Sequence, residues 1–304
     1  ANAGGANTGV SWADAYTNLQ TALQLAQAGD SVWVAEGTYF PTDSTDRAIA
    51  FEPKSGVRLY GGFAGTEMDL SERDWVAHPT VLSGDIGVNG DSTDNAYTTM
   101  YLENPDTGTV VDGFVFRYGN ADNLDNTIPS LGPQKCGGAM YIMGQDGWAY
   151  PDVQNCIFEY NYAHNNGGAV YVNGLGLGSV APRFLNCTFR DNKARLDGGG
   201  IYRYGSSWIE RFPDFGDCIF VGNHAQRRGG GMYVLDRERT DTINWLNCLF
   251  EKNSANLQGG AKYINLGRFE GSLVTIHDCV YDANHARESP MLHLESNNFQ
   301  NTKL

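Results

Sequence analysis

The segment "NCTFRDNKARLDGGGIY", residues 186–202, places cysteine, phenylalanine, asparagine, alanine, glycine and tyrosine in one fixed order. The same order returns along the chain, where its cysteines are separated by 31, 31, 30 and 31 residues. These cysteines are Cys156, Cys187, Cys218, Cys248 and Cys279. A constant period of this length is typical of proteins in which each repeat stacks on the next.

The other residues of the segment recur with the same period. Their columns are Phe158, Phe189, Phe220, Phe250 and Tyr281; Asn161, Asn192, Asn223, Asn253 and Asn284; Ala163, Ala194, Ala225, Ala255 and Ala286; the glycine pairs at 167/168, 198/199, 229/230 and 259/260; and Tyr171, Tyr202, Tyr233 and Tyr263. An earlier repeat, "FVFRYGNA" followed by "GGAMYI", fits the pattern if residues 122–133 are an inserted loop.

Short β-branched and aromatic runs without helical periodicity predict coils made of strands, stacked at about 4.8 Å. Identical residues then form ladders along the stack. We expect cysteine and phenylalanine to fill the core and the glycine pair to turn one corner. We expect each asparagine to turn another corner with left-handed backbone, while its amide bonds to the amide one coil away.

The paired "FxxN" and "GGA" or "GGG" elements resemble the repeats of chlamydial polymorphic outer-membrane proteins. The N-terminal "SWADAYTNLQTALQLAQAGDSVWVAEGTYFPT", "GVRLYGGFAGTE" and "LSGDI" resemble the opening of secreted right-handed parallel β-helix proteins of Bacteroidetes. The resemblance implies an all-β fold, a right-handed single-stranded parallel β-helix with coils of about 31 residues. It also implies a secreted or cell-surface protein without an assigned reaction.

We expect one continuous domain, in which residues 1–105 hold an N-terminal cap and the first coils and residues 106–304 hold the repeat coils. Ser11 with Asp14 resembles a capping box, and apolar residues at helical spacing from Trp12 to Ala26 predict an amphipathic helix that plugs the end of the core. The last repeat has Ser289 and Pro290 in place of its glycine pair. Either the solenoid stops at this repeat, or the chain is longer and has an anchor or sorting domain after residue 304, and the second alternative is favoured.

The formal net charge of -14 argues against a nucleic-acid partner. Residues 1–105 hold 14 acidic and 4 basic residues, so they carry -10 of this charge. No run of residues is apolar and long enough for a membrane-spanning helix, so no membrane insertion is expected. Serine-nucleophile, phosphate-loop and zinc-protease motifs are absent from the sequence.

If the Asn and Ala of each repeat point inward, the residues between and after them point outward. These positions are Tyr162, Lys193, His224, Ser254 and His285, then His164, Arg195, Gln226, Asn256 and Arg287, with Arg227 and Arg228 extending the row. One interpretation is a groove for acidic polysaccharide. The other is a solvated face whose cations pair with Asp191, Asp197 and Glu251.

As an enzyme, this basic row would act as a lyase, with a cation that neutralises a uronate carboxylate and a base that removes the α-proton. The candidates are Lys193 and Arg195 for the cation and His224, His164 and Tyr162 for the base. The sequence lacks the catalytic Asp clusters expected of pectinase-like β-helix enzymes.

The neighbours of the tyrosine column are apolar in eight of ten cases, which predicts that they face the core and that the tyrosines face outward. The row Tyr141, Tyr171, Tyr202, Tyr233 and Tyr263 would then be either a flat surface for sugar rings or a structural ladder. Aromatic residues in the following loops, Trp148, Trp208 and Trp245 among them, could form a binding rim or could fold back to cover apolar strand surface.

The cysteine ladder predicts buried free thiols, because in-register side chains point in parallel and suit a disulfide poorly. Asp85, Asn89, Asp91 and Asp94 in "SGDIGVNGDSTDN" offer oxygen ligands for calcium or form a polar turn. No other cofactor is expected.

These features favour a secreted or surface-anchored binding, adhesive or stalk module without catalysis, whose partners are glycans or another surface protein. The alternatives are a carbohydrate-active enzyme, either a polysaccharide lyase or a glycosidase, and a purely structural spacer of a longer surface protein.

Overall fold

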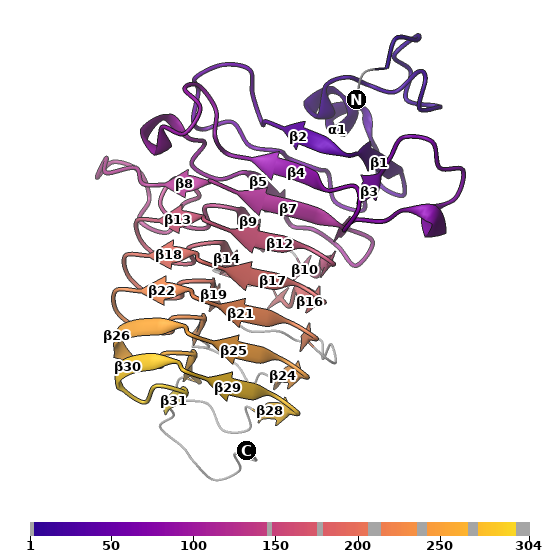
Figure 1. Ribbon diagram of the computed structural model, residues 1–304. Coiled ribbons are helices and arrows are strands. Elements are labelled where there is room, and N and C mark those ends of the chain that lie inside the picture. Colours follow the sequence, from indigo (N-terminus) through magenta and orange to yellow (C-terminus); the bar gives the residue numbers. More distant parts are fainter. Residues whose placement is uncertain are drawn as a thin grey trace.

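Each 31-residue repeat folds as one coil of a parallel β-solenoid in the computed structural model (Figure 1). The structure describes residues 3–144, 148–174, 179–205, 214–235, 242–266 and 273–295, with backbone alone at residues 148, 179, 242 and 273. Successive coils stack their strands into four long parallel sheets, A to D, so the predicted all-β solenoid is confirmed.

Sheets A and B have eight strands each. In spatial order, sheet A contains β1 (Ser31–Ala35), β3 (Arg58–Phe63), β6 (Val110–Asp112), β11 (Asp152–Gln154), β16 (Arg183–Leu185), β20 (Phe215–Gly216), β24 (Thr242–Leu246) and β28 (Leu273–His277). Sheet B contains β2 (Gly37–Tyr39), β4 (Thr80–Ser83), β7 (Phe114–Arg117), β12 (Ile157–Glu159), β17 (Thr188–Arg190), β21 (Ile219–Val221), β25 (Leu249–Glu251) and β29 (Val280–Asp282).

Sheets C and D complete the coil. Sheet C contains β5 (Met100–Glu103), β9 (Met140–Met143), β14 (Val170–Asn173), β19 (Ile201–Tyr204), β23 (Met232–Leu235), β27 (Lys262–Asn265) and β31 (Leu292–Glu295). Sheet D contains β8 (Asn120–Ala121), β13 (Tyr162–Ala163), β18 (Lys193–Ala194), β22 (His224–Ala225), β26 (Ser254–Gln258) and β30 (His285–Glu288). The remaining elements are α1 (Leu19–Leu25), the 3-10 turns η1 (Leu70–Glu72) and η2 (Ser92–Asp94), and the pair β10 (Trp148–Ala149) and β15 (Ser179–Val180).

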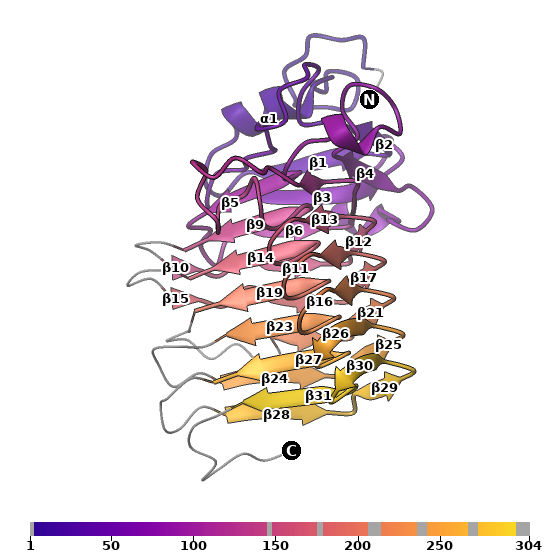
Figure 2. The same ribbon diagram turned by 90° about the vertical axis from the view of Figure 1, so that its left-hand side faces the viewer.

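One coil runs from sheet A through B and D to C before the chain returns to A one level further along. Figures 1 and 2 show the strands as rungs that follow one another from the N-terminal to the C-terminal end. Phe158 is the register partner of Phe189, and Tyr171 is the partner of Tyr202. The sequence columns are therefore ladders in space.

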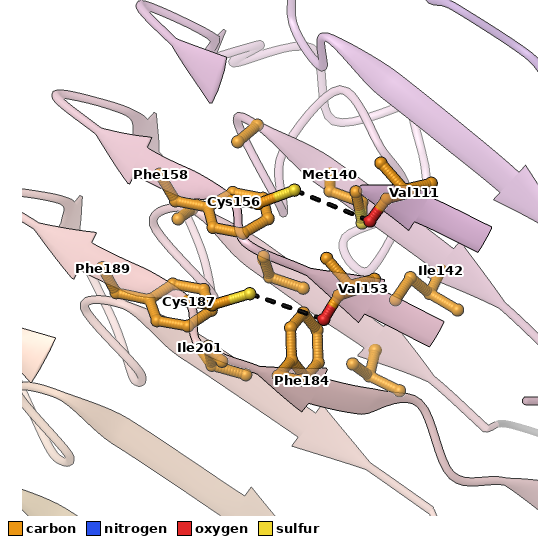
Figure 3. Close-up of a cluster of buried hydrophobic side chains, with 14 of the residues drawn as sticks. Val111, Met140, Ile142, Val153, Cys156, Phe158, Phe184, Cys187, Phe189 and Ile201 are labelled. Atoms are coloured by element: carbon orange, nitrogen blue, oxygen red, sulfur yellow. Dashed lines mark hydrogen bonds between the residues drawn. The ribbon is translucent and has the colours of Figure 1, made fainter. Parts of the chain in front are cut away.

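The core is built from these ladders. Five pairs of neighbouring rings stack between Phe116 and Tyr281 on sheet B, with centroids 4.5 to 5.4 Å apart. The cysteines lie beside them, and Figure 3 shows Cys156 and Cys187 pointing inward toward sheet A. The Cys156 thiol lies 3.1 Å from the carbonyl oxygen of Gln154 and 3.6 Å from that of Val111, so it links two coils.

The asparagine column forms the amide ladder that the sequence predicts. Asn161 Nδ2 donates to Asn192 Oδ1 at 3.0 Å, and Asn192 donates to Asn223 Oδ1 at 3.0 Å. The expected left-handed backbone is not at these asparagines, however. It lies one residue earlier, at Tyr160 (φ 56°) and Asp191 (φ 55°), because the amide must point inward to reach its neighbour.

Each glycine pair turns the corner from sheet D to sheet C, as expected. In the pair at 198/199 the first glycine has φ 71°, and a Cβ on Gly199 would lie 2.3 Å from the Gly230 carbonyl oxygen. The first glycine supplies the left-handed backbone and the second allows two coils to approach closely. Ser289 takes the first position in the last coil, with φ 53°, and β30 and β31 still pair with β26 and β27.

The N-terminal helix caps the core but is shorter than predicted. It begins after the N-cap Asn18, and its buried Leu19 and Leu23 join the core at the end seen in Figure 1. The Ser11 hydroxyl donates to Asp14 within a separate turn, where Asp14 also accepts from the Ala6 amide. The Asp14 carboxylate therefore stabilises this turn, and the expected capping box is not at the start of the helix.

Candidate functional site

Sheet D carries the outward basic row that the sequence predicts. Its inner strands β13, β18 and β22 are two residues long, and in each the alanine is buried while the residue before it faces outward. Figure 1 shows these strands as a narrow ladder beside the broader sheet B. The amide ladder fixes this orientation, because the asparagine preceding each strand is held inside the coil.

We call the outward positions of this sheet the basic stripe. It consists of Tyr162, Lys193, His224, Ser254 and His285, with His164, Arg195, Gln226, Asn256 and Arg287 in the adjacent column. Lys193 and Arg195 are exposed, and the histidines at 164 and 224 are partly buried between coils. The stripe follows the solenoid axis, since its members are register neighbours.

Contacts within the stripe join neighbouring coils. Arg195 Nη1 lies 2.9 Å from His164 Nε2, and His224 Nδ1 lies 2.9 Å from the Ser254 hydroxyl. Burial lowers the pKa of His164, and Arg195 adds to this effect. Burial and then Lys193 lower the pKa of His224, so both histidines are neutral near pH 7.

The carboxylates expected to neutralise this row do so at one position. Asp197 lies 3.8 Å from Arg227, at the edge of the stripe. Glu251 pairs instead with Lys252. Within the described part of the chain, Lys193, Arg195 and Arg287 have no carboxylate within ion-pair distance. The expected pairing with carboxylates is therefore not found at the centre of the stripe, where Lys193 and Arg195 face solvent.

The tyrosine column points away from the main core, as predicted, but it is buried. Tyr171 is 0% exposed and Tyr202 is 6% exposed. The ring stack contains Tyr101, Tyr141, Tyr171, Tyr202, Tyr233, Tyr263 and His293, with centroids 4.8 to 5.7 Å apart. Each inner ring covers the faces of its two neighbours, so no face is free to stack on a sugar.

Other groups cover the edges and hydroxyls of these tyrosines. The Tyr141 hydroxyl donates to the Leu131 carbonyl oxygen at 2.5 Å and accepts from Asn173. Leu131 belongs to the inserted segment that joins β8 to β9. Cys136 packs in the same cluster. The structural-ladder interpretation is the one that these contacts support, and the exposed aromatic surface is not present.

The predicted aromatic rim receives no support from the described residues. Trp245 is 0% exposed and stacks on Phe215 inside the core, with centroids 5.7 Å apart. It belongs to a second aromatic ladder with Phe184 that the sequence columns did not reveal. The side chains of Trp148 and Trp208 lie outside the described residues.

The acidic segment is organised as turns. Asp85 accepts from the Gly90 amide at 3.0 Å, Asp91 caps η2 through the Thr93 amide, and Asp94 accepts from the Val88 amide at 2.7 Å. Asn89 is exposed between them. Among the residues that the structure describes, no three or more His, Cys, Asp or Glu side chains gather in a way that could hold a metal ion. The carboxylates satisfy backbone amides, which fits the polar-turn alternative.

The ladder cysteines are free thiols, as predicted. Four are buried, and Cys279 in the last coil is partly exposed. The residue immediately before every ladder cysteine is an asparagine or aspartate with left-handed backbone, a pattern that the sequence analysis did not identify. Asn186 donates to Asn155 at 2.7 Å, so these residues form a second, outer ladder.

Two coils of the chain match a known repeat. Residues 155–173 and 186–202 match the Chlamydia polymorphic membrane protein (Chlamydia_PMP) repeat. The matched segments include the cysteine, phenylalanine, asparagine and glycine columns described above, so the chain carries repeats of this type. No curated protein and no solved structure gave a significant match. No helix within the described residues has the length and apolar character needed to cross a membrane.

Proposed function

We propose that the chain is a repeat module of an exported surface protein and that it binds extended acidic glycans through the basic stripe. The repeat match supports the first part, because such repeats belong to outer-membrane surface proteins. The observation that carries the second part is the pair of exposed, unneutralised cations Lys193 and Arg195 on a chain of net charge -14.

The arrangement suits a linear polyanion better than a compact anion. The stripe runs parallel to the solenoid axis and repeats at the strand spacing of about 4.8 Å. A polymer lying along it would meet cations and hydrogen-bond donors from several coils at once. The strong negative charge elsewhere on the chain would direct such a polymer to this face.

One observation favours the lyase as a second candidate. His164 and Arg195 are in contact, and Tyr162 lies on β13 two residues before His164, with Lys193 as its register partner. In this contact Arg195 donates to His164 Nε2, so the imidazole could accept a substrate proton only after a uronate carboxylate had drawn the guanidinium away. Burial raises the pKa of Tyr162, which disfavours the tyrosine as the base at neutral pH.

A polysaccharide panel tests both candidates. The purified chain is assayed for retention on acidic and neutral polysaccharides and for the absorbance of unsaturated uronate products. We expect retention on acidic polymers that falls about tenfold or more in the double variant Lys193→Ala, Arg195→Ala. Lys252→Ala is the matched control, because it removes an exposed lysine that is paired with Glu251 outside the stripe.

The outcomes separate the functions. Product formation that disappears in His164→Ala would establish the lyase. Retention without turnover would support the binding module. Absence of any interaction with the panel would refute glycan binding and leave a structural spacer.

A further inference from the structure

Two exposed tyrosines, Tyr118 and Tyr160, lie where the chain turns from a strand of sheet B to a strand of sheet D. We call them the corner pair, and Figure 1 shows the second of these turns between β12 and β13. Tyr118 is 37% exposed and Tyr160 is 51% exposed. Their rings stack with centroids 6.1 Å apart and an interplanar angle of 20°. The corner pair is separate from the buried tyrosine ladder of sheet C.

The backbone at this corner disfavours tyrosine. Tyr118 has φ 63° and Tyr160 has φ 56°, in the left-handed region that few bulky side chains adopt. In the three following coils the same position holds Asp191, Gly222 and Lys252, each also with positive φ. The turn therefore forms without an aromatic residue, and the exposed rings of the corner pair fill no part of the core. Residues held in such disfavoured backbone cluster at ligand-binding sites.

The two faces of the Tyr160 ring have different surroundings. One face lies against Tyr118, over whose ring the Arg117 guanidinium also lies, 5.3 Å from the centroid. Among the described residues, Tyr160 stacks on no ring except that of Tyr118. Asp191 follows at the corner of the next coil, and its carboxylate is directed toward Gly222, because a Cβ on that glycine would lie 2.6 Å from Asp191 Oδ1. The second face of Tyr160 is therefore free, with a carboxylate nearby.

The free face of Tyr160 lies at the end of a row of charged residues. Asp191, Lys193 and Arg195 alternate with buried residues along one coil, so all three point outward. The Tyr160 amide joins this coil by donating to the Arg190 carbonyl oxygen at 3.3 Å. The row runs across the solenoid axis and contains the two unneutralised cations of the basic stripe.

We propose that the free face of Tyr160 stacks on one uncharged pyranose ring of the bound glycan, while the acidic sugars next to that ring lie on Lys193 and Arg195. This inference rests on the proposed glycan binding and adds the class of sugar that adjoins the acidic groups. One face of a pyranose ring carries C–H groups that pack on an aromatic ring. Its edge carries hydroxyls that donate to a carboxylate such as that of Asp191.

The direction of the stack determines which part of a glycan fits. Tyr118 and Tyr160 come from successive coils, so their rings stack along the solenoid axis. A sugar ring added to this stack lies across the axis, whereas a polymer on the stripe runs along it. The stacked sugar therefore belongs to a chain end or to a branch of the polymer.

The carboxylate of Asp191 selects against an acidic sugar at this place. A uronate or sulfate group on the stacked ring would bring a second negative charge close to this exposed carboxylate. An uncharged ring meets only a hydrogen-bond acceptor there. The corner pair therefore favours glycans in which neutral and acidic sugars adjoin over polymers in which every sugar is acidic.

The test compares three oligosaccharides of equal backbone length by isothermal titration. They are an oligogalacturonate, in which every sugar is charged, an uncharged xylo-oligosaccharide, and the same xylo-oligosaccharide with one glucuronate branch. We expect Tyr160→Asn to lower the affinity for the branched oligosaccharide about tenfold, because the stacking face is lost. The same variant should change the affinity for the oligogalacturonate less than about twofold.

Further variants separate stacking from a loss of structure. Tyr160→Phe should retain the affinity for the branched oligosaccharide, because stacking uses the ring and not the hydroxyl. Lys252→Asn is the matched control, since it makes the same residue at the same corner position three coils later and should leave the affinity unchanged. Tyr160→Asn should unfold no earlier than the wild-type chain on heating, because asparagine tolerates left-handed backbone.

The outcomes distinguish this inference from the function on which it rests. If the wild-type chain binds neither charged oligosaccharide, glycan binding and the stacking site are both refuted. If it binds the oligogalacturonate and Tyr160→Asn binds the branched oligosaccharide as tightly as the wild-type chain does, the stacking site alone is refuted. An equal loss of affinity for both charged oligosaccharides in Tyr160→Asn would overturn the preference for an uncharged ring.

Discussion

Because of one buried lysine, Lys262, the free energy of unfolding is expected to change with pH in the alkaline range. Burial lowers the pKa of Lys262 from 10.5 to about 8 in the folded chain. Below pH 8 both folded and unfolded chains hold the proton, so the cost of the buried charge is fully present. Between pH 8 and 10.5 the unfolded chain binds more protons, and stability rises with pH.

Lys262→Met should therefore stabilise the chain at neutral pH. The pKa difference corresponds to about 3 kcal/mol in the free energy of unfolding. Urea unfolding of the chain at pH 7 and pH 9.5 measures the gain. We expect the wild-type chain to gain stability between these values more steeply than Lys262→Met. Equal pH slopes in the two proteins would contradict the buried-charge account.

The asparagines of the amide ladder are buried polar residues whose side chains, unlike that of Lys262, have hydrogen-bond partners. Asn192 Nδ2 donates to the Phe158 carbonyl oxygen at 2.8 Å and to Asn223, while its Oδ1 accepts from Asn161. Asn192→Ala would leave these buried partners unsatisfied and should cost about 3 kcal/mol or more of unfolding free energy. Chemical denaturation measures this loss, and Lys193→Ala, at the exposed neighbouring position, should change it little. A loss below about 1 kcal/mol would show that the coils remain stably packed when one amide of the ladder is missing.

At the scale of elements, the corner from sheet D to sheet C leaves no room for a side chain on its second glycine. A Cβ on Gly199 would meet the Gly230 carbonyl oxygen at 2.3 Å and the His224 backbone at 2.6 Å. Both neighbours are backbone atoms, so the clash can be relieved only by separating the coils. We expect Gly199→Ala to abolish cooperative thermal unfolding or lower the midpoint by more than about 10 °C. Gly4→Ala, where a Cβ meets open space, is the control.

The repeat period predicted the elements well where each residue has an equivalent one coil away. The strands, the inward cysteines and alanines, and the outward lysine and histidines all follow from the columns. The N-terminal helix has no such equivalents, and there the prediction began too early. The Ser11 and Asp14 pair closes a local turn, and Asn18 caps the helix instead. Local capping patterns cannot tell which of two turns will continue into a helix.

The tyrosine column shows a second limit of prediction. The apolar neighbours of each tyrosine correctly gave the direction of the side chain. The solvent exposure of the tyrosines could not be predicted from their neighbours in the strand, because it depends on residues outside the repeat, such as Leu131 and Cys136. Lys262 is a related case: its column predicts an inward position, and the sequence gives no reason for a charge there.

At the scale of the whole molecule, the charge distribution predicts how ligand binding responds to pH. His164 faces Arg195, Lys135 and Asp122, and His224 faces Lys193 and Ser254. Their lowered pKa values keep both histidines neutral at pH 7. A polyanion lying on the stripe would favour the charged imidazolium, so binding should take up protons and strengthen as pH falls.

We expect the affinity for a sulfated polysaccharide, whose own charge does not change in this range, to rise severalfold between pH 7 and about pH 5. The double variant His164→Gln, His224→Gln retains the cations Lys193 and Arg195 but cannot gain these charges. Its affinity should therefore respond less to pH, although carboxylates elsewhere lose charge in both proteins. Isothermal titration at constant ionic strength measures both profiles. If the variant follows the wild-type profile, the pH response belongs to the overall charge of -14 and the histidines of the stripe do not contact the ligand.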